Sequence, residues 1–189
     1  MKAKKRTKII FVCTGNTCRS PMAEMLLKKK LKALKLTGAK ACSAGLQATP
    51  GSPMNDKAAQ TLRNKGIRAI KFASKQLDEK LVKESLAIIC MTDKQRDIVM
   101  DMRWTALRKD CVKDIENNVY SFSDIVGYQV MDPYGQDLDC YEYVFGLLEG
   151  GMSALIDKIL PEEIRAEYVT KPRKLKEKPQ EKAEQISLF

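Results

Sequence analysis

The chain contains no histidine, and this absence excludes several classes of site at once. A Ser-His-Asp triad, a cysteine-histidine protease and a histidine-based metal centre all need an imidazole. None of the six cysteines forms a C-x-x-C pair, so the usual spacing of zinc sites and dithiol redox motifs is missing as well. Any chemistry in this chain must therefore rest on thiol, carboxylate, guanidinium and backbone groups.

Long apolar runs are also missing. No stretch approaches the ~20 apolar residues of a membrane span, and the run Ile9–Cys13 is too short for the core of a signal peptide. In a chain of 189 residues without such segments, the six cysteines are expected to be free thiols of a reducing compartment. We therefore expect a cytoplasmic protein with one main domain and no membrane contact.

Positive charge is in excess, with a formal net charge of +10, but most of it lies at the two ends. Residues 1–8 carry five positive and no negative groups, and residues 171–189 carry six positive and three negative groups. This distribution favours solvated tails over a nucleic-acid surface. We expect a basic N-terminal arm over residues 1–7, a domain over residues 8–165 and a disordered basic tail over residues 170–189. Nucleic acid is not an expected partner, and the protein is expected to be a monomer or a weak dimer.

The first element of the domain is expected to be a buried strand over Ile9–Cys13, because all five residues are apolar. The turn-forming residues 14–16 follow it. Ser20 suits an N-cap and Pro21 suits a first helical position, so a helix should begin there and end near Gly38. A strand, a tight loop and a helix in this order form a phosphate-binding layout.

The remainder of the chain alternates between strand and helix patterns, which predicts an α/β fold with a parallel sheet. We expect a three-layer sandwich around four parallel strands in the order 2-1-3-4, with ligands bound in the loop after the first strand. The further strands are expected at residues 39–45, 86–91 and 119–122. The further helices are expected at residues 55–66, from a capping box at Thr92–Gln95 to about residue 102, and from residue 138 onward with a kink or break at Gly150–Gly151.

The loop after the first strand holds the groups that cleavage of a phosphate ester or phosphoramidate needs. Backbone N–H groups of a turn rich in Gly and Asn can surround an anion. Arg19 offers a planar fork that binds two phosphate oxygens. Cys13 lies at the end of the strand as a nucleophile, and helix N-termini and nearby cations favour the thiolate form of a cysteine. Ser20 can donate a hydrogen bond to that sulfur, and Asn16 can hold the shape of the loop.

Residues 13–20 read Cys-Thr-Gly-Asn-Thr-Cys-Arg-Ser and are followed by Pro-Met-Ala-Glu. This segment resembles the low-molecular-weight protein phosphatase family, whose signature is a cysteine, five residues and Arg-Ser. The resemblance covers about residues 8–160, with Asp132-Pro133 late in the chain as in that family. It implies that the substrate is a phosphorylated protein, that no metal or cofactor is needed, and that the phosphate is bound by Thr14, Gly15, Asn16, Thr17, Cys18, Arg19 and Ser20.

The family's mechanism implies roles for three residues. Cys13 would accept the phosphoryl group while Asp132 protonates the leaving atom, and water would then hydrolyse the phosphocysteine with Asp132 as base. Arg19 would stabilise the transferring oxygens. In related enzymes a cysteine at the position of Cys18 captures an oxidised nucleophile as a disulfide, although Cys18 could equally be a packing residue. Ser43 matches a family position that braces the asparagine of the loop.

The family contains tyrosine phosphatases and arginine phosphatases, and two features favour the second. Thr14 follows the nucleophile, where tyrosine-directed members usually have an apolar residue and arginine-directed members resemble this chain. The segment Leu46–Pro53 contains no aromatic residue to stack on a phenyl ring. Tyr134 remains as one possible pocket wall. We therefore expect phosphoarginine to be preferred over phosphotyrosine.

Two rival interpretations remain. Thiol-dependent arsenate reductases share this fold and loop, but they need a further close pair of cysteines, and no such pair follows Cys18. The other rival is an inactive phosphate cradle with basic tails that bind nucleic acid or an acidic partner. The presence of Cys13, Arg19 and Asp132 together argues against that binding module.

Overall fold

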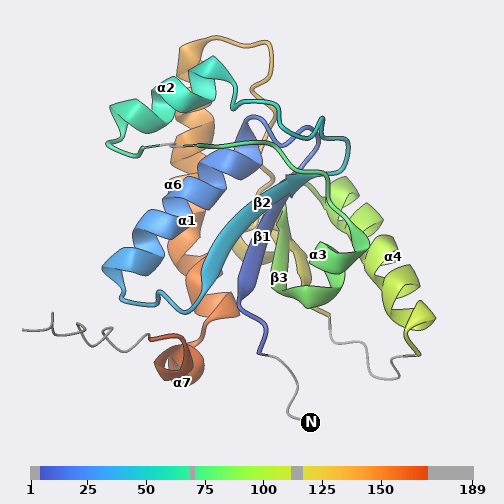
Figure 1. Cartoon of the computed structure of the whole chain (residues 1–189). Helices are drawn as coiled ribbons and strands as arrows, with labels where there is room; N and C mark the ends of the chain where they lie inside the picture. The colour runs from blue at the N-terminus through green and yellow to red at the C-terminus, as the bar shows by residue number, and fades with distance from the viewer. Residues whose placement is uncertain (1–4, 69–70, 112–116, 170–189) are drawn as a thin grey trace, which may run out of the picture.

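The computed structural model describes residues 5–68, 71–111 and 117–169 (Figure 1). Four parallel strands form one sheet in the order β2-β1-β3-β4, as the sequence predicts. The strands are β1 (Lys8–Cys13), β2 (Lys40–Gly45), β3 (Ser85–Cys90) and β4 (Val119–Ser121). The chain leaves β1 for β2 on one side and later returns to β3 on the other side. This reversal opens a crevice beyond the carboxyl end of β1, where Cys13 lies.

Helices cover both faces of the sheet (Figure 1), and the central strand β1 is accordingly apolar and buried from Ile9 to Cys13. Ile9 and Phe11 point to one face and pack with α1 (Arg19–Ala33), α2 (Asp56–Asn64) and α6 (Leu138–Ile159). Ile10 and Val12 point to the other face, toward α3 (Glu79–Glu84) and α4 (Asp93–Lys109). The remaining short helices are α5 (Phe122–Val126), α7 (Glu162–Arg165) and the 3-10 helix η1 (Ala166–Tyr168).

Helix boundaries differ from the sequence prediction in four places. Helix α1 ends at Ala33, before the predicted end near Gly38, and Lys35 just beyond it takes a left-handed conformation that cannot continue the helix. Helix α1 begins at Arg19 with Cys18 as its N-cap, so the expectation that Ser20 caps it is wrong. The Ser20 hydroxyl is engaged in the loop instead. Helix α4 continues to Lys109, well past the predicted end near residue 102. Phe122 opens α5 instead of closing the fourth strand, because Ser121 and Asp124 form a capping box there.

Helix α6 runs without interruption through Gly150–Gly151, so a break at these glycines does not occur. The reason is tertiary packing. A Cβ atom on Gly151 would lie 2.7 Å from the Phe122 ring and 3.1 Å from a Val126 methyl group. The missing side chain therefore lets α5 approach α6 closely, and this packing offsets the weak helix propensity of glycine.

We expect two glycine substitutions in α6 to change stability in opposite directions. Gly151→Ala should lower the free energy of unfolding by about 1–3 kcal/mol, because the new methyl group overpacks the contact with α5. Gly146→Ala should raise it by up to about 1 kcal/mol, because that exposed position has open space and alanine favours a helix. Urea unfolding monitored by circular dichroism measures both. Equal effects of the same sign would contradict the packing argument.

The described part of the N-terminal arm is docked on the domain. Lys5 Nζ lies 2.9 Å from a carboxylate oxygen of Glu167 and 4.0 Å above the centre of the Tyr168 ring. The Tyr168 hydroxyl donates to the carbonyl of Arg6. The predicted disordered tail over residues 170–189 lies outside the described residues. Among the described helices, none has the length and apolar character that crossing a bilayer requires.

Candidate active site

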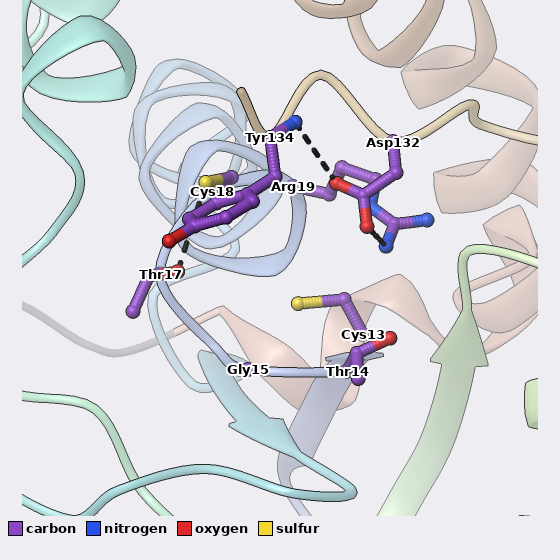
Figure 2. A pocket seen from close by; sticks show the side chains of 8 residues that line it. All are labelled: Cys13, Thr14, Gly15, Thr17, Cys18, Arg19, Asp132 and Tyr134. Carbon is purple, nitrogen blue, oxygen red and sulfur yellow. Dashed lines mark hydrogen bonds and ion pairs between the residues drawn. The ribbon is translucent and has the colours of Figure 1, made fainter. Parts of the chain in front are cut away.

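A pocket of about 230 Å³ opens beyond the carboxyl end of β1. Figure 2 shows the Cys13 sulfur pointing into it from below, with Tyr134, Arg19 and Asp132 on the opposite side. The structure thus brings the three predicted catalytic side chains together with most of the predicted phosphate loop. The lining residues are Cys13, Thr14, Gly15, Thr17, Cys18, Arg19, Asp132 and Tyr134.

The Cys13 sulfur is held by the loop that follows it. Its Sγ atom lies 3.0 Å from the Ser20 hydroxyl oxygen, and the Cys13 residue is only 3% exposed. Asn16 Nδ2 donates to the same hydroxyl oxygen at 2.9 Å, so the Ser20 hydrogen is left for the sulfur or for the carbonyl of Ala44.

The backbone of the loop is tied down on its outer side. The carbonyls of Cys13, Thr14 and Thr17 accept hydrogen bonds from the N–H groups of residues 46, 47 and 55. Asn16 adopts a left-handed conformation with φ of 55°. Its Oδ1 atom accepts the backbone N–H of Lys75 at 2.8 Å. Carbonyls that are bonded on the outer side and a left-handed residue within the loop are both features of anion-binding nests.

Gly45 at the end of β2 makes this loop possible. A Cβ atom at this position would lie 2.6 Å from the carbonyl oxygen of Thr14 and 3.0 Å from the backbone nitrogen of Asn16. Only a residue without a side chain can stand so close to the loop backbone. Gly45 therefore supports the site by letting the end of β2 approach the loop backbone.

Arg19 and Asp132 form the far wall. Arg19 Nη2 lies 2.5 Å from Asp132 Oδ2, and Arg19 Nη1 donates to the carbonyl of Val130 at 3.2 Å. The guanidinium is nearly buried, whereas the carboxylate is half exposed. Asp132 Oδ1 accepts the N–H of Tyr134 at 3.2 Å, so both carboxylate oxygens are oriented. A guanidinium and a carboxylate thus lie opposite one sulfur across one small pocket.

Residues 8–169 match the family described as low molecular weight phosphotyrosine protein phosphatase. The chain belongs to this family. A protein-arginine-phosphatase of Geobacillus stearothermophilus is 32% identical over 156 residues, which cover 82% of this chain and 98% of that protein.

Solved structures of the family include both kinds of phosphatase. The arginine phosphatase YwlE, as a mutant with a phosphorylated active-site serine, superposes with a TM-score of 0.72 at 27% identity. That match covers 84% of this chain and 99% of the other. The tyrosine phosphatase AmsI of Erwinia amylovora gives a TM-score of 0.68 at 26% identity, over 84% of this chain and 96% of its own. The family fold is therefore common to arginine-directed and tyrosine-directed members.

Cys18, the second cysteine of the family loop, is buried beside an aromatic hydroxyl. Its Sγ atom lies 3.4 Å from the Tyr141 hydroxyl and 3.6 Å from the Thr17 hydroxyl. Burial raises the pKa of the Cys18 thiol, although the two hydroxyl contacts oppose that effect. Burial and the contact with Cys18 also raise the pKa of Tyr141. Burial thus disfavours the thiolate form of Cys18, which is the nucleophilic form of a cysteine.

The expected contact between Ser43 and Asn16 needs correction. Ser43 donates its hydroxyl hydrogen to Glu24 at 2.5 Å. Glu24 also pairs with Lys28 one turn further along α1. Asn16 is braced by Ser20 and by the Lys75 N–H instead. Ser43 thus fastens β2 to α1 behind the loop and supports the site only through the backbone.

Sequence reasoning missed Gln95, whose side chain reaches the site from α4. Its Nε2 atom donates to the Thr14 hydroxyl oxygen at 3.2 Å. The spacing of Thr92 and Gln95 indicates a capping box, and Thr92 does accept the Gln95 N–H. Helix capping alone therefore explained a glutamine at this position in the sequence. The contact of its side chain with Thr14 becomes visible only in the folded structure.

Proposed function

We propose that this family member hydrolyses phosphoarginine in proteins through a phosphocysteine intermediate. The observation that carries the proposal is the placement of the Cys13 sulfur opposite Arg19 and Asp132 within one pocket (Figure 2). Its preference for arginine is supported by the polar threonines of the pocket wall and by the similarity to protein-arginine-phosphatases.

In the first step the Cys13 thiolate attacks phosphorus, and a sulfur–phosphorus bond forms as the phosphorus–nitrogen bond breaks. The leaving guanidine nitrogen takes a proton from Asp132, so the arginine side chain leaves as a guanidinium. Arg19 and the loop N–H groups bind the phosphoryl oxygens whose charge is redistributed in the transition state. The substrate phosphoryl group must therefore take over the Arg19 donor that Asp132 now occupies at 2.5 Å.

In the second step a water molecule attacks the phosphocysteine. Asp132, now a carboxylate, takes one proton from that water, and the sulfur leaves as a thiolate. The Ser20 hydroxyl, 3.0 Å from the Cys13 sulfur, stabilises this leaving group by a hydrogen bond. Inorganic phosphate is released, and both residues return to their starting protonation states.

Selection of arginine rests on the walls around the sulfur. Two threonines, Thr14 and Thr17, line the pocket, and their hydroxyl groups can bond to guanidinium nitrogen atoms. An apolar side chain at either position would instead pack on a phenyl ring. The neighbouring segment Leu46–Pro53 supplies no aromatic side chain for stacking.

Phosphotyrosine is the second candidate substrate, because one feature of the pocket suits it. Tyr134 lines the pocket and is 70% exposed, so its ring is free to stack on an aromatic substrate. A planar guanidinium can stack on the same ring, so this residue alone does not decide between the two.

The deciding test compares turnover of phosphoarginine and phosphotyrosine by wild type and by Thr14→Ile. We expect wild type to prefer phosphoarginine, and we expect the substitution to lower the ratio of the two kcat/KM values by about 10–100-fold, because a polar contact is replaced by an apolar wall. Thr105→Ile, at an exposed position on α4, is the matched control and should leave the ratio unchanged. Better turnover of phosphotyrosine by wild type would refute the arginine assignment.

A further inference from the structure

Gln95 connects the body of the fold to the wall of the pocket. It lies in the first turn of α4 and is only 7% exposed. Its Oε1 atom accepts the N–H of Met91, the residue after β3, at 3.2 Å. Its Nε2 atom donates to the Thr14 hydroxyl oxygen at 3.2 Å. In a complete capping box this side chain would turn back to the N–H of Thr92. Here it reaches across to the loop after β1 instead.

The direction of the Gln95 amide is unambiguous. A backbone N–H can only donate, so the amide atom facing Met91 must be the oxygen and the atom facing Thr14 must be the nitrogen. The Thr14 hydroxyl oxygen therefore accepts a hydrogen bond from Gln95. Its own hydrogen and its second lone pair remain for other partners, and the Thr14 side chain is held in one rotamer.

The fold does not depend on this contact. The Met91 N–H also donates to the carbonyl of Val12 at 3.1 Å, so it stays bonded when the Gln95 oxygen is removed. The Gln95 N–H keeps its bond to Thr92 whatever the side chain is. The contact to Thr14 is thus a polar bridge from a buried helix position to a pocket wall, beyond what the capping of α4 needs.

We propose that Gln95 is a positioning residue for substrate selection, acting through Thr14. Its hydrogen bond to the Thr14 hydroxyl oxygen fixes the χ1 rotamer of Thr14. That rotamer decides whether the hydroxyl or the methyl group of Thr14 contacts the leaving group of the substrate. Without it, the hydroxyl and the methyl of Thr14 exchange places by rotation about χ1, and the wall becomes less polar on average. This inference rests on the proposed function, because it concerns the selection of guanidinium over phenyl.

The test is a double-mutant cycle with Gln95→Met and Thr14→Val, assayed with phosphoarginine and phosphotyrosine. Gln95→Met should lower the phosphoarginine-to-phosphotyrosine ratio of kcat/KM by about 3–10-fold in the Thr14 background, the usual size of one lost hydrogen bond. In the Thr14→Val background it should change the ratio by less than about twofold. Lys94→Met, an exposed neighbour in the same helical turn, is the matched control.

A second measurement reads the rotamer directly. Three-bond NMR couplings to the Thr14 methyl group should indicate one χ1 rotamer in wild type and averaged rotamers in Gln95→Met. An averaged Thr14 in wild type, or an equal change of the ratio in both backgrounds, would overturn the proposal. If wild type prefers phosphotyrosine, the proposed preference for phosphoarginine is refuted, but the role of Gln95 in positioning Thr14 is not. The coupling between Gln95 and Thr14 is still read from phosphotyrosine turnover and from the NMR couplings.

Discussion

Replacement of Cys13 by serine is expected to abolish hydrolysis of phosphoarginine and of p-nitrophenyl phosphate, with a loss in kcat of about 10⁴-fold or more. The Ser20 hydroxyl lies 3.0 Å from the Cys13 sulfur and Arg19 lines the same pocket. These surroundings would not rescue the variant, because a serine hydroxyl is a much weaker acid and a weaker nucleophile than a thiol. Steady-state assays measure the loss. Acid quenching with ³²P-labelled substrate should trap a phosphoenzyme in wild type, labelled at Cys13.

Cys140→Ser is the matched control, because it makes the same atomic change at a half-buried position in the first turn of α6. It should keep wild-type turnover. Substantial activity in Cys13→Ser would contradict covalent catalysis by this residue. Wild-type protein that binds nucleic acid in a salt-sensitive way and hydrolyses none of these substrates would instead support the rival binding module.

Replacement of Asp132 by asparagine is expected to lower kcat/KM for phosphoarginine by about 10²–10⁴-fold. Asparagine keeps the shape of the side chain and can still accept the Tyr134 N–H, but it cannot donate a proton to the leaving nitrogen. The loss for p-nitrophenyl phosphate should be much smaller in kcat/KM, because p-nitrophenolate leaves without a proton. Its kcat should still fall where hydrolysis of the phosphocysteine limits turnover, since that step needs the carboxylate as a base.

Asp139→Asn provides the control for this experiment. Asp139 is exposed and lies in the first turn of α6, seven residues from the candidate acid, so its substitution removes a nearby charge without touching the pocket lining. It should change kcat/KM by less than about twofold. Equal losses in kcat/KM for both leaving groups in Asp132→Asn would argue that Asp132 orients Arg19 and does not transfer a proton.

The short-range features of the site were predictable because they lie in eight consecutive residues. An apolar strand, a turn and a helix place Cys13 and Arg19 on opposite sides of one loop, whatever the remainder of the chain does. The strand order was predictable as well. The exact start of α1 was not, because Ser20 is a good N-cap by local preference, yet its hydroxyl is used by Cys13 and Asn16.

For helix α6, the prediction from local sequence preference was wrong for a different reason. Two adjacent glycines predict a break from local propensity alone. In the folded protein Gly151 meets Phe122 and Val126, and the close contact of α5 with α6 makes the helix continuous. Local preference was overridden because the contact that decides the conformation comes from residues more than twenty positions earlier.

The amino-acid sequence by itself determined the parallel α/β fold and the loop that holds a thiol and a guanidinium together. Both follow from apolar periodicity and from neighbouring residues. The family resemblance named Asp132 in advance, but only the tertiary structure shows its contact with Arg19, 113 positions away. Only the tertiary structure also adds Gln95, 81 positions from its partner Thr14. The physical reason is that such contacts depend on strand order and helix packing, which bring the carboxyl ends of separate strands to one edge of the sheet.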